Sequence, residues 1–184
     1  MKIKSFLLLL ASAFLLFSCA SVPEPSEKTT AFLYGNVKTV FNWRSNNYGI
    51  PENFETEKNI IVKVKNTSTG KVYRLAANDE GEIMSASLPK GHYQLYKISA
   101  KVPVNGHDWK FENEFGEDAD FRVIDGVVNL GKISYDIDYQ SEIYYQYSTS
   151  WGFDPQLAHR KFEILHPDSQ WNNAMWRLRD GERE

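Results

Sequence analysis

The sequence predicts a mainly β protein, an antiparallel β-sandwich that ends in a short segment of two helices. Two observations favour this fold class. From Ala31 onward, apolar and polar residues alternate with a period of two, which is typical of strands with one buried and one solvated face. After Tyr147 the apolar residues recur instead at the spacing of a helix. We therefore expect the sandwich at residues 31–148 and the helices at 149–184.

The individual strands follow from this alternation. The clearest one, GKISYDIDY, covers residues 131–139, and Val62 and Val64 alternate with lysines in the same way. Further strands are predicted at residues 32–43, 72–76, 93–98, 109–111 and 121–124. Turn residues separate them at 69–70, 79–81, 89–91, 105–106 and 125–126. Turns about every ten residues are typical of a sandwich or barrel.

Two short helices are predicted at the carboxyl end. The first begins with Asp154 as N-cap and Pro155 at its first position, and Pro167 ends it. The second begins at residue 168 or 169, and its apolar stripe comprises Trp171, Ala174, Met175 and Leu178. Helices this short are unstable alone and should pack on the sandwich. Trp176 lies off the stripe, so we expect it to be exposed and to offer a contact to a partner.

The composition indicates a folded domain and excludes some functions. Of the 184 residues, 42% are hydrophobic and 14% aromatic, which is enough for a core. Lysine and arginine number 21 against 24 aspartates and glutamates, so nucleic acid is a poor partner, because a phosphate-backbone binder needs a basic surface. The single cysteine, Cys19, excludes an intramolecular disulfide and a zinc site built from several thiolates.

The first eighteen residues have the layout of a secretory signal peptide. Lys2 and Lys4 precede an apolar run at residues 6–17 that only Ser12 interrupts. Twelve residues of helix rise about 18 Å, which is short of a hydrocarbon core of about 30 Å. A retained membrane-spanning helix is therefore disfavoured.

Residues 16–19, Leu-Phe-Ser-Cys, resemble the bacterial lipobox, although Phe17 replaces its usual small residue. The resemblance implies that the Cys19 sulfur receives a diacylglyceryl group, that peptide 1–18 is removed, and that the new amine is acylated, for example with palmitate. Several acyl chains anchor a protein stably without a membrane-spanning helix. Ala20 after the cysteine favours the outer membrane. The alternative is cleavage after Ala20, which would release a soluble protein that starts at Ser21.

A flexible tether is predicted between the anchor and the sandwich. Residues 19–30 contain the lipidated cysteine followed by two prolines and several small polar residues. The eleven residues after the cysteine would reach at most about 40 Å when extended. We expect the folded part to stay near the bilayer.

Residues 62–98, VKVKNTSTGKVYRLAANDEGEIMSASLPKGHYQLYKI, resemble the core of prealbumin-like, carboxypeptidase-regulatory-like sandwich modules. Leu88, Pro89, Gly91 and Tyr93 fit the turn with which such modules enter an aromatic strand. Residues 121–133, FRVIDGVVNLGKI, resemble the penultimate segment of many small envelope lipoproteins. The resemblance covers residues 59–137 and implies a prealbumin-like sandwich. Because such modules are mostly non-catalytic, it also implies a spacer, adhesive or binding role.

Two groups of residues have metal-ligand chemistry. His159, Glu163 and His166 stand at i, i+4 and i+7, but His166 precedes a proline and no fourth ligand is evident, so we expect ordinary solvated histidines. Carboxylates that can hold calcium gather in residues 112–120, at Glu112, Glu114, Glu117, Asp118 and Asp120. Their spacing fits no EF-hand loop, and a solvated acidic turn is the preferred interpretation.

The aromatic run YYQYSTSWGF, at residues 144–153, offers rings that stack on sugars, and the candidate binding residues are Tyr145, Trp151 and Phe153. Aromatic residues in strands are more often core or cross-strand pairs.

Nucleophilic catalysis lacks support, because no serine lies in a G-x-S-x-G elbow and Cys19 would be alkylated.

We therefore expect a non-enzymatic binding or assembly module that is lipid-anchored in the cell envelope, most simply in the outer membrane. Its partners would be the membrane, through the lipid, and another envelope protein or a glycan. No cofactor besides the covalent lipid is expected. The alternative is an envelope enzyme or a metal-dependent accessory factor that uses residues 112–120 or His159 with Glu163.

Overall fold

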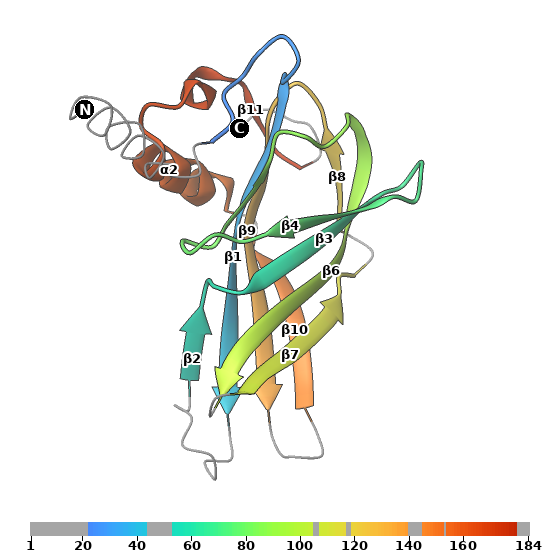
Figure 1. Cartoon of the computed structure of the whole chain (residues 1–184), viewed down its shortest axis with the longest axis vertical. Helices are drawn as coiled ribbons and strands as arrows, with labels where there is room; N and C mark the ends of the chain where they lie inside the picture. Colours follow the sequence, from blue (N-terminus) through green and yellow to red (C-terminus); the bar gives the residue numbers. More distant parts are fainter. Residues whose placement is uncertain are drawn as a thin grey trace, which may run out of the picture.

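The computed structural model describes residues 22–43, 53–104, 107–116, 119–139, 145–152 and 154–179. These residues form two β-sheets that face each other, and a short helix lies on the far side of one of them (Figure 1). The prediction of a mainly β protein with its helix at the carboxyl end is confirmed.

The first sheet has the order β10-β9-β1-β2, with β5 added beside β1 and β11 beside β9. Its strands are β1 (Ala31–Trp43), β2 (Asn53–Thr56), β5 (Glu82–Ser85), β9 (Gly126–Tyr139), β10 (Tyr145–Gly152) and β11 (Trp176–Arg177). The two central strands, β1 and β9, are parallel along their whole length, as is β11 with β9. The expectation of purely antiparallel pairing is therefore wrong, because alternation reveals the faces of a strand and not its direction.

The second sheet is antiparallel throughout, in the order β4-β3-β6-β7, with β8 beside one end of β6. Its strands are β3 (Ile60–Asn66), β4 (Val72–Ala76), β6 (Gly91–Val104), β7 (His107–Glu114) and β8 (Asp120–Val123). In β3, every second residue is buried. The alternation that predicted this strand thus corresponds to one face toward the core and one toward solvent.

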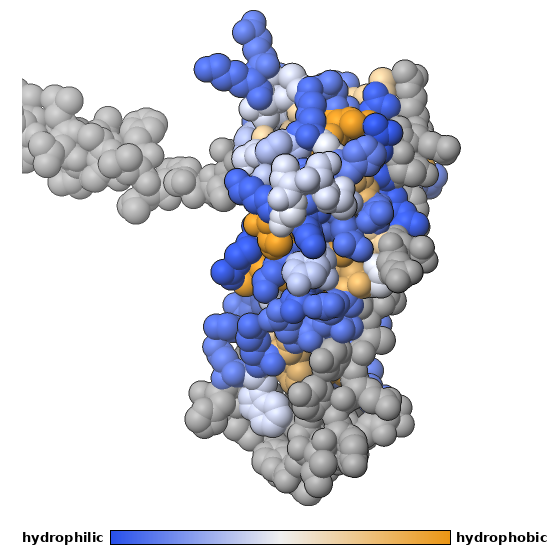
Figure 2. Space-filling view, turned by 90° about the vertical axis from the view of Figure 1, so that its right-hand side faces the viewer, coloured by the Kyte–Doolittle hydropathy of each residue, from blue (hydrophilic) through white to orange (hydrophobic). Residues whose placement is uncertain are grey.

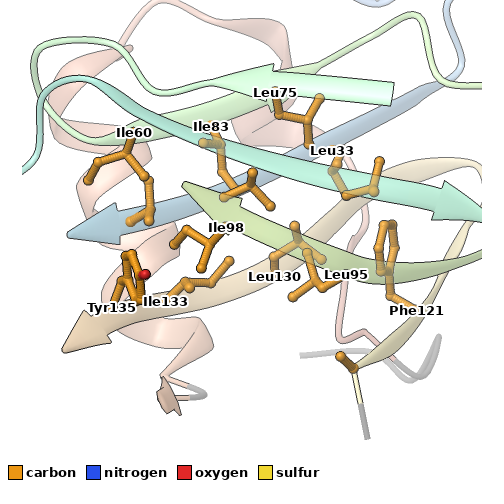
Figure 3. Close-up of a cluster of buried hydrophobic side chains, with 14 of the residues drawn as sticks. Leu33, Ile60, Leu75, Ile83, Leu95, Ile98, Phe121, Leu130, Ile133 and Tyr135 are labelled. Atoms are coloured by element: carbon orange, nitrogen blue, oxygen red, sulfur yellow. The ribbon is translucent and has the colours of Figure 1, made fainter. Parts of the chain in front are cut away.

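The main core lies between the two sheets. In Figure 3, Leu33 and Ile133 of the first sheet point toward Leu95 and Ile98 of the second. The ring centroids of Phe41 and Phe111 lie 5.4 Å apart across the same space. Each fully buried apolar side chain of this kind contributes about 1.5–3 kcal/mol to folding.

The turns use glycine where the backbone requires it. Gly81 ends the turn before β5 with a φ of +72°, and a Cβ added there would lie 2.5 Å from the carbonyl oxygen of Val37. Gly126, which begins β9, has a φ of +95°. Both glycines lie in turns predicted from the sequence, and both positions disfavour any other residue.

The opposite face of the first sheet is covered by α2 (Pro155–Leu165). Asp154 caps this helix, since its Oδ1 accepts a hydrogen bond from the Leu157 N–H at 2.8 Å. Ala158 and Phe162 of α2 pack on outward-facing residues of β1 and β9, and they belong to a second cluster, which we call the cap core. Its buried members are Val22, Phe32, Tyr34, Val127, Ala158, Phe162, Trp171 and Trp176.

The second predicted helix is wrong. Only one 3-10 turn, η1 (Gln170–Asn173), forms, and the chain then extends into β11, where Trp176 pairs with Val127 of β9. Strand geometry buries Trp176, which is only 5% exposed, and leaves Met175 exposed. The apolar stripe of the predicted helix placed Met175 inside and Trp176 outside. This prediction failed because strand pairing with β9 overrode the local helical spacing. The sheet also continues past residue 148, to Gly152 at the end of β10.

The segment just before β1 is docked on the cap core. Val22 is buried there, and the carbonyl oxygen of Pro23 accepts a hydrogen bond from Trp171 Nε1 at 2.7 Å. The Glu24 carboxylate accepts a hydrogen bond from the Gln170 N–H at 2.8 Å. Residues 22–24 of the segment expected to act as a flexible tether are thus bound to the folded domain.

Candidate functional site

A pocket of about 530 Å³ opens at one end of the second sheet. It lies between the β3–β4 turn, the start of β6, β8 and the last described residue, Arg179. Its lining residues are Thr67, Ser68, His92, Tyr93, Asp120, Phe121, Arg122 and Arg179. A volume of this size suits a ligand as large as one or two sugar rings.

The β3–β4 turn forms one wall of the pocket. The side-chain oxygen of Asn66 accepts hydrogen bonds from the backbone N–H groups of Ser68 and Thr69, at 3.1 and 2.9 Å. The Thr67 N–H donates to the carbonyl oxygen of His92 at 3.0 Å, which ties the turn to β6. This wall is therefore fixed before a ligand arrives, and it carries two hydroxyl groups, those of Thr67 and Ser68.

The floor of the pocket is aromatic. The rings of Tyr93 and Phe121 stack with centroids 5.5 Å apart and an interplanar angle of 20°. The Tyr93 hydroxyl donates to the carbonyl oxygen of Pro89 at 2.7 Å, and burial raises the pKa of Tyr93. The hydroxyl therefore remains a protonated donor at neutral pH. Because Tyr93 and Phe121 are only 0% and 2% exposed, the two rings belong to the main core and close the base of the pocket.

The rim of the pocket is predominantly basic. His92 of β6 and Arg122 of β8 are direct cross-strand partners, and the Arg122 N–H donates to the carbonyl oxygen of Arg179 at 3.1 Å. These three basic residues line the pocket together with one acidic residue, Asp120. Guanidinium groups bind carboxylate and phosphate oxygens in two-point geometry, so the rim favours an anionic ligand.

The surface around the pocket is hydrophilic. Figure 2 views the molecule from the side of β8 and of the β3–β4 turn, and most of the described surface there is polar, with only small separate hydrophobic areas. The buried rings of Tyr93 and Phe121 therefore lie beneath a polar surface. This arrangement is typical of a site for a polar ligand.

The predicted acidic segment does not form a metal site in the described residues. The Glu112 carboxylate lies 2.9 Å from Lys110 Nζ and 3.2 Å from both Lys63 Nζ and Lys97 Nζ. Hydrogen bonds from these lysines, foremost Lys110, lower the pKa of Glu112 to about 2. Glu114 pairs with Lys97 at 3.4 Å.

The remaining acidic candidates are dispersed. Asp120 lines the pocket, while Glu117 and Asp118 lie outside the described residues. Across the described ranges, no three histidine, cysteine or acidic side chains are grouped to hold a metal ion.

The three residues of the predicted histidine group diverge. His159 stacks on Trp176 with ring centroids 3.9 Å apart, and its Nε2 lies 3.9 Å from Glu163 Oε1. His166 has left the helix, with a φ of −131°, and its Nε2 lies 3.1 Å from both oxygens of Glu82. The proline that follows His166 explains this departure, as expected.

Sequence reasoning missed the buried carboxylate of Glu82, which is 2% exposed. It accepts hydrogen bonds from Tyr34 Oη and Asn78 Nδ2, both at 2.8 Å, and contacts His166. Burial, and then the charge of Glu82, raise the pKa of Tyr34 far above its usual value. We call Glu82, Tyr34, Asn78 and His166 the carboxylate clasp. It fastens the end of α2 to β1 and β5.

The aromatic candidates have different outcomes. Trp176 is buried, so its predicted exposure is wrong, while the partner contact predicted there stays a prediction. Tyr145 and Trp151 lie in β10 opposite Tyr139 and Ile133 of β9. Phe153 lies outside the described residues, as does Cys19, so their predicted roles stay predictions. In the part of the chain that the structure describes, no helix has the length and apolar character needed to cross a membrane.

Comparison with known proteins yields little. The chain matches no family model and no curated protein. Among solved structures, it is similar to a leucine-rich repeat protein from Bacteroides thetaiotaomicron VPI-5482, with 17% sequence identity and a TM-score of 0.30. The similarity covers 59% of this chain and spans only 14% of the length of that protein.

Proposed function

We propose that this protein is a lipid-anchored cell-envelope lipoprotein with a prealbumin-like sandwich, and that it acts as a non-enzymatic binding module for a small anionic sugar. One observation carries the binding role. Arg122, Arg179 and His92 surround the pocket, whose floor is the stacked pair of Tyr93 and Phe121. A basic rim beside the hydroxyl-bearing Thr67 and Ser68 suits a small sugar that bears a carboxylate or phosphate group.

Each part of the pocket has a role in this proposal. The two guanidinium groups bind the anionic group of the ligand, and the buried rings of Tyr93 and Phe121 hold the base of the pocket rigid. Thr67, Ser68 and Asp120 exchange hydrogen bonds with its hydroxyl groups. Because the walls are already hydrogen-bonded in place, little ordering entropy opposes binding.

The envelope location is supported by the amino-terminal sequence. Lys2, Lys4 and the apolar run at residues 6–17 have the layout of an export signal, and the lipobox-like residues end in Cys19. Lipid chains on Cys19 would hold the protein at the membrane, with the outer membrane favoured by Ala20.

Binding is tested by titrating the purified mature protein with three related sugars: glucuronic acid, glucose 6-phosphate and neutral glucose. We expect at least one of the two anionic sugars to bind and neutral glucose to bind at least tenfold more weakly. Arg122→Ala should weaken the anionic sugar about tenfold or more, since it removes a charged partner. Arg74→Ala is the matched control, because Arg74 is exposed on β4 and outside the pocket. Equal binding of charged and neutral sugars, or equal loss in both variants, would contradict the proposal.

The anchor is tested by mass spectrometry of the mature amino terminus. We expect a terminal Cys19 that carries a diacylglyceryl thioether and an acyl group on its amine. The Cys19→Ala variant should leave the membrane fraction. An unmodified chain that begins at Ser21 would refute lipidation.

A further inference from the structure

The docked amino-terminal segment shortens the distance between the lipid and the fold. Val22 is buried against α2 and η1, and Pro23 and Glu24 are hydrogen-bonded to Trp171 and Gln170. Three residue steps of about 3.8 Å separate Cys19 from Val22, so their Cα atoms lie at most about 11 Å apart. A lipid on Cys19 thus brings the cap core to the membrane surface rather than about 40 Å from it.

The helix beside this entry point exposes two large apolar residues on its outer side. Leu157 and Ile164 of α2 are 50% and 77% exposed, far more than core residues of their type. With Arg160 they stand at i, i+3 and i+7 on one face of the helix. Lys161, at i+4, marks the edge of this face, because its Nζ contacts the Glu57 carboxylate and the Glu80 carbonyl oxygen of the folded domain. Leu165 and Met175 are exposed nearby in the chain. This face is distinct from the face of Ala158 and Phe162, which covers the first sheet.

Exposed apolar residues are concentrated in this segment. Five large hydrophobic side chains are exposed among the described residues, and four of them lie between Leu157 and Met175. The fifth is Val72 of β4, on the second sheet. In Figure 1, α2 lies at the left of the first sheet, whereas β8 and the tip of the β3–β4 turn lie at the right, on the hydrophilic side seen in Figure 2.

We propose that the outer face of α2 rests on the lipid bilayer, with Leu157 and Ile164 inserted among the headgroups. This inference rests on the proposed lipidation of Cys19. A helix of 11 residues is about 16 Å long, and amphipathic helices of this kind lie in the membrane plane about 5–10 Å deep. Arg160 is exposed and extends toward the phosphates, as long cationic side chains do beside a buried apolar stripe.

This orientation has a consequence for the pocket. Because the pocket lies on the side of β8 and α2 on the other, contact of α2 with the bilayer directs the pocket away from the membrane. The sugar site would remain open to the aqueous phase. The anchor and α2 together then hold the domain in one orientation, which a lipid on a long tether does not.

Photo-crosslinking in native membranes tests the proposal. A benzophenone amino acid is placed at position 164 in one variant and at position 72 in another. Both residues are exposed and apolar, so both variants should fold, and position 72 is the matched control. We expect lipid adducts at position 164 in at least fivefold excess over position 72. Equal yields at the two positions, no lipid adduct at position 164, or adducts there only with protein would overturn the inference.

The failure of this inference is distinguishable from failure of the anchor. The same samples are fractionated before irradiation. Protein in the membrane fraction without lipid adducts at position 164 rejects contact through α2 and leaves lipidation standing. Protein absent from the membrane fraction rejects the anchor itself and, with it, the orientation.

Discussion

The two cores of this protein are built differently. The core between the sheets is mainly aliphatic, and residues from both sheets contribute to it by strand alternation. The cap core is mainly aromatic, and it depends on one short helix, one 3-10 turn and a buried carboxylate. An 11-residue helix is not stable alone, so the cap exists only while it is packed. We therefore expect the cap core to unfold while both sheets stay folded, whereas unfolding of the sheets also unfolds the cap core.

The largest effect is expected from Phe41→Ala in the main core. Phe41 is fully buried and contacts Phe111 of the other sheet. Removing its ring should lower the free energy of unfolding by about 4 kcal/mol, because it leaves a cavity between the sheets. Urea denaturation, followed by far-UV circular dichroism, measures the loss. The control is Val72→Ala, which should change stability by less than about 0.5 kcal/mol.

The same substitution in the cap core, Phe162→Ala, should cost about 3 kcal/mol, and the loss should be local. Phe162 contacts Phe32, Tyr34 and Trp176. Hydrogen exchange should accelerate in α2 and remain slow in β3 and β6. Equal acceleration in the sheets would show that the two cores unfold as one unit.

Glu82→Gln tests the carboxylate clasp separately from the aromatic packing of the cap core. The substitution keeps the shape of the side chain and removes the charge that Tyr34, Asn78 and His166 contact. We expect a loss of about 2 kcal/mol, since hydrogen bonds to charged groups are among the stronger ones. The near-UV circular dichroism signal of the cap-core tryptophans should weaken, because their rings become less rigidly packed. Glu114→Gln, on the exposed edge of the second sheet, is the matched substitution and should have little effect.

The smallest effect is expected at Glu112, where the carboxylate lies on the surface among lysines. Its pKa falls from 4.5 to about 2 on folding, so its contribution is complete above about pH 4.5 and is lost as the pH falls toward 2. Glu112→Gln should cost about 1 kcal/mol at pH 7 and almost nothing at pH 2. Thermal denaturation at both pH values measures the difference. An unchanged cost at pH 2 would contradict the electrostatic origin.

Much of the main core could be predicted from the sequence, because alternation and glycine turns are local signals. Residues 72–76 match β4, and Gly81 and Gly126 lie in turns as expected. The direction of β9 relative to β1 could not be predicted, since parallel pairing is decided by the path of the chain between them.

The cap core was harder to predict, because its residues are buried by partners far away in the sequence. Trp176 has the local spacing of an exposed helical residue and is buried only because it pairs with β9. Glu82 follows a glycine turn, where a charged residue is usually solvated, and nothing nearby in the chain indicates that His166 contacts it. The pocket was missed for the same reason: Thr67, His92, Arg122 and Arg179 come from four separate segments.

The parallel pairing of β1 with β9 also governs when the protein can fold. Ala31 pairs with Gly126 and Trp43 with Tyr139, so partners lie roughly 95 residues apart, and closing so long a loop slows folding. The first sheet therefore cannot assemble while residues 126–139 are still being synthesised. In a chain exported from its amino terminus, as proposed, β1 crosses the membrane before β9, so the central strand pair can form only after both strands have crossed.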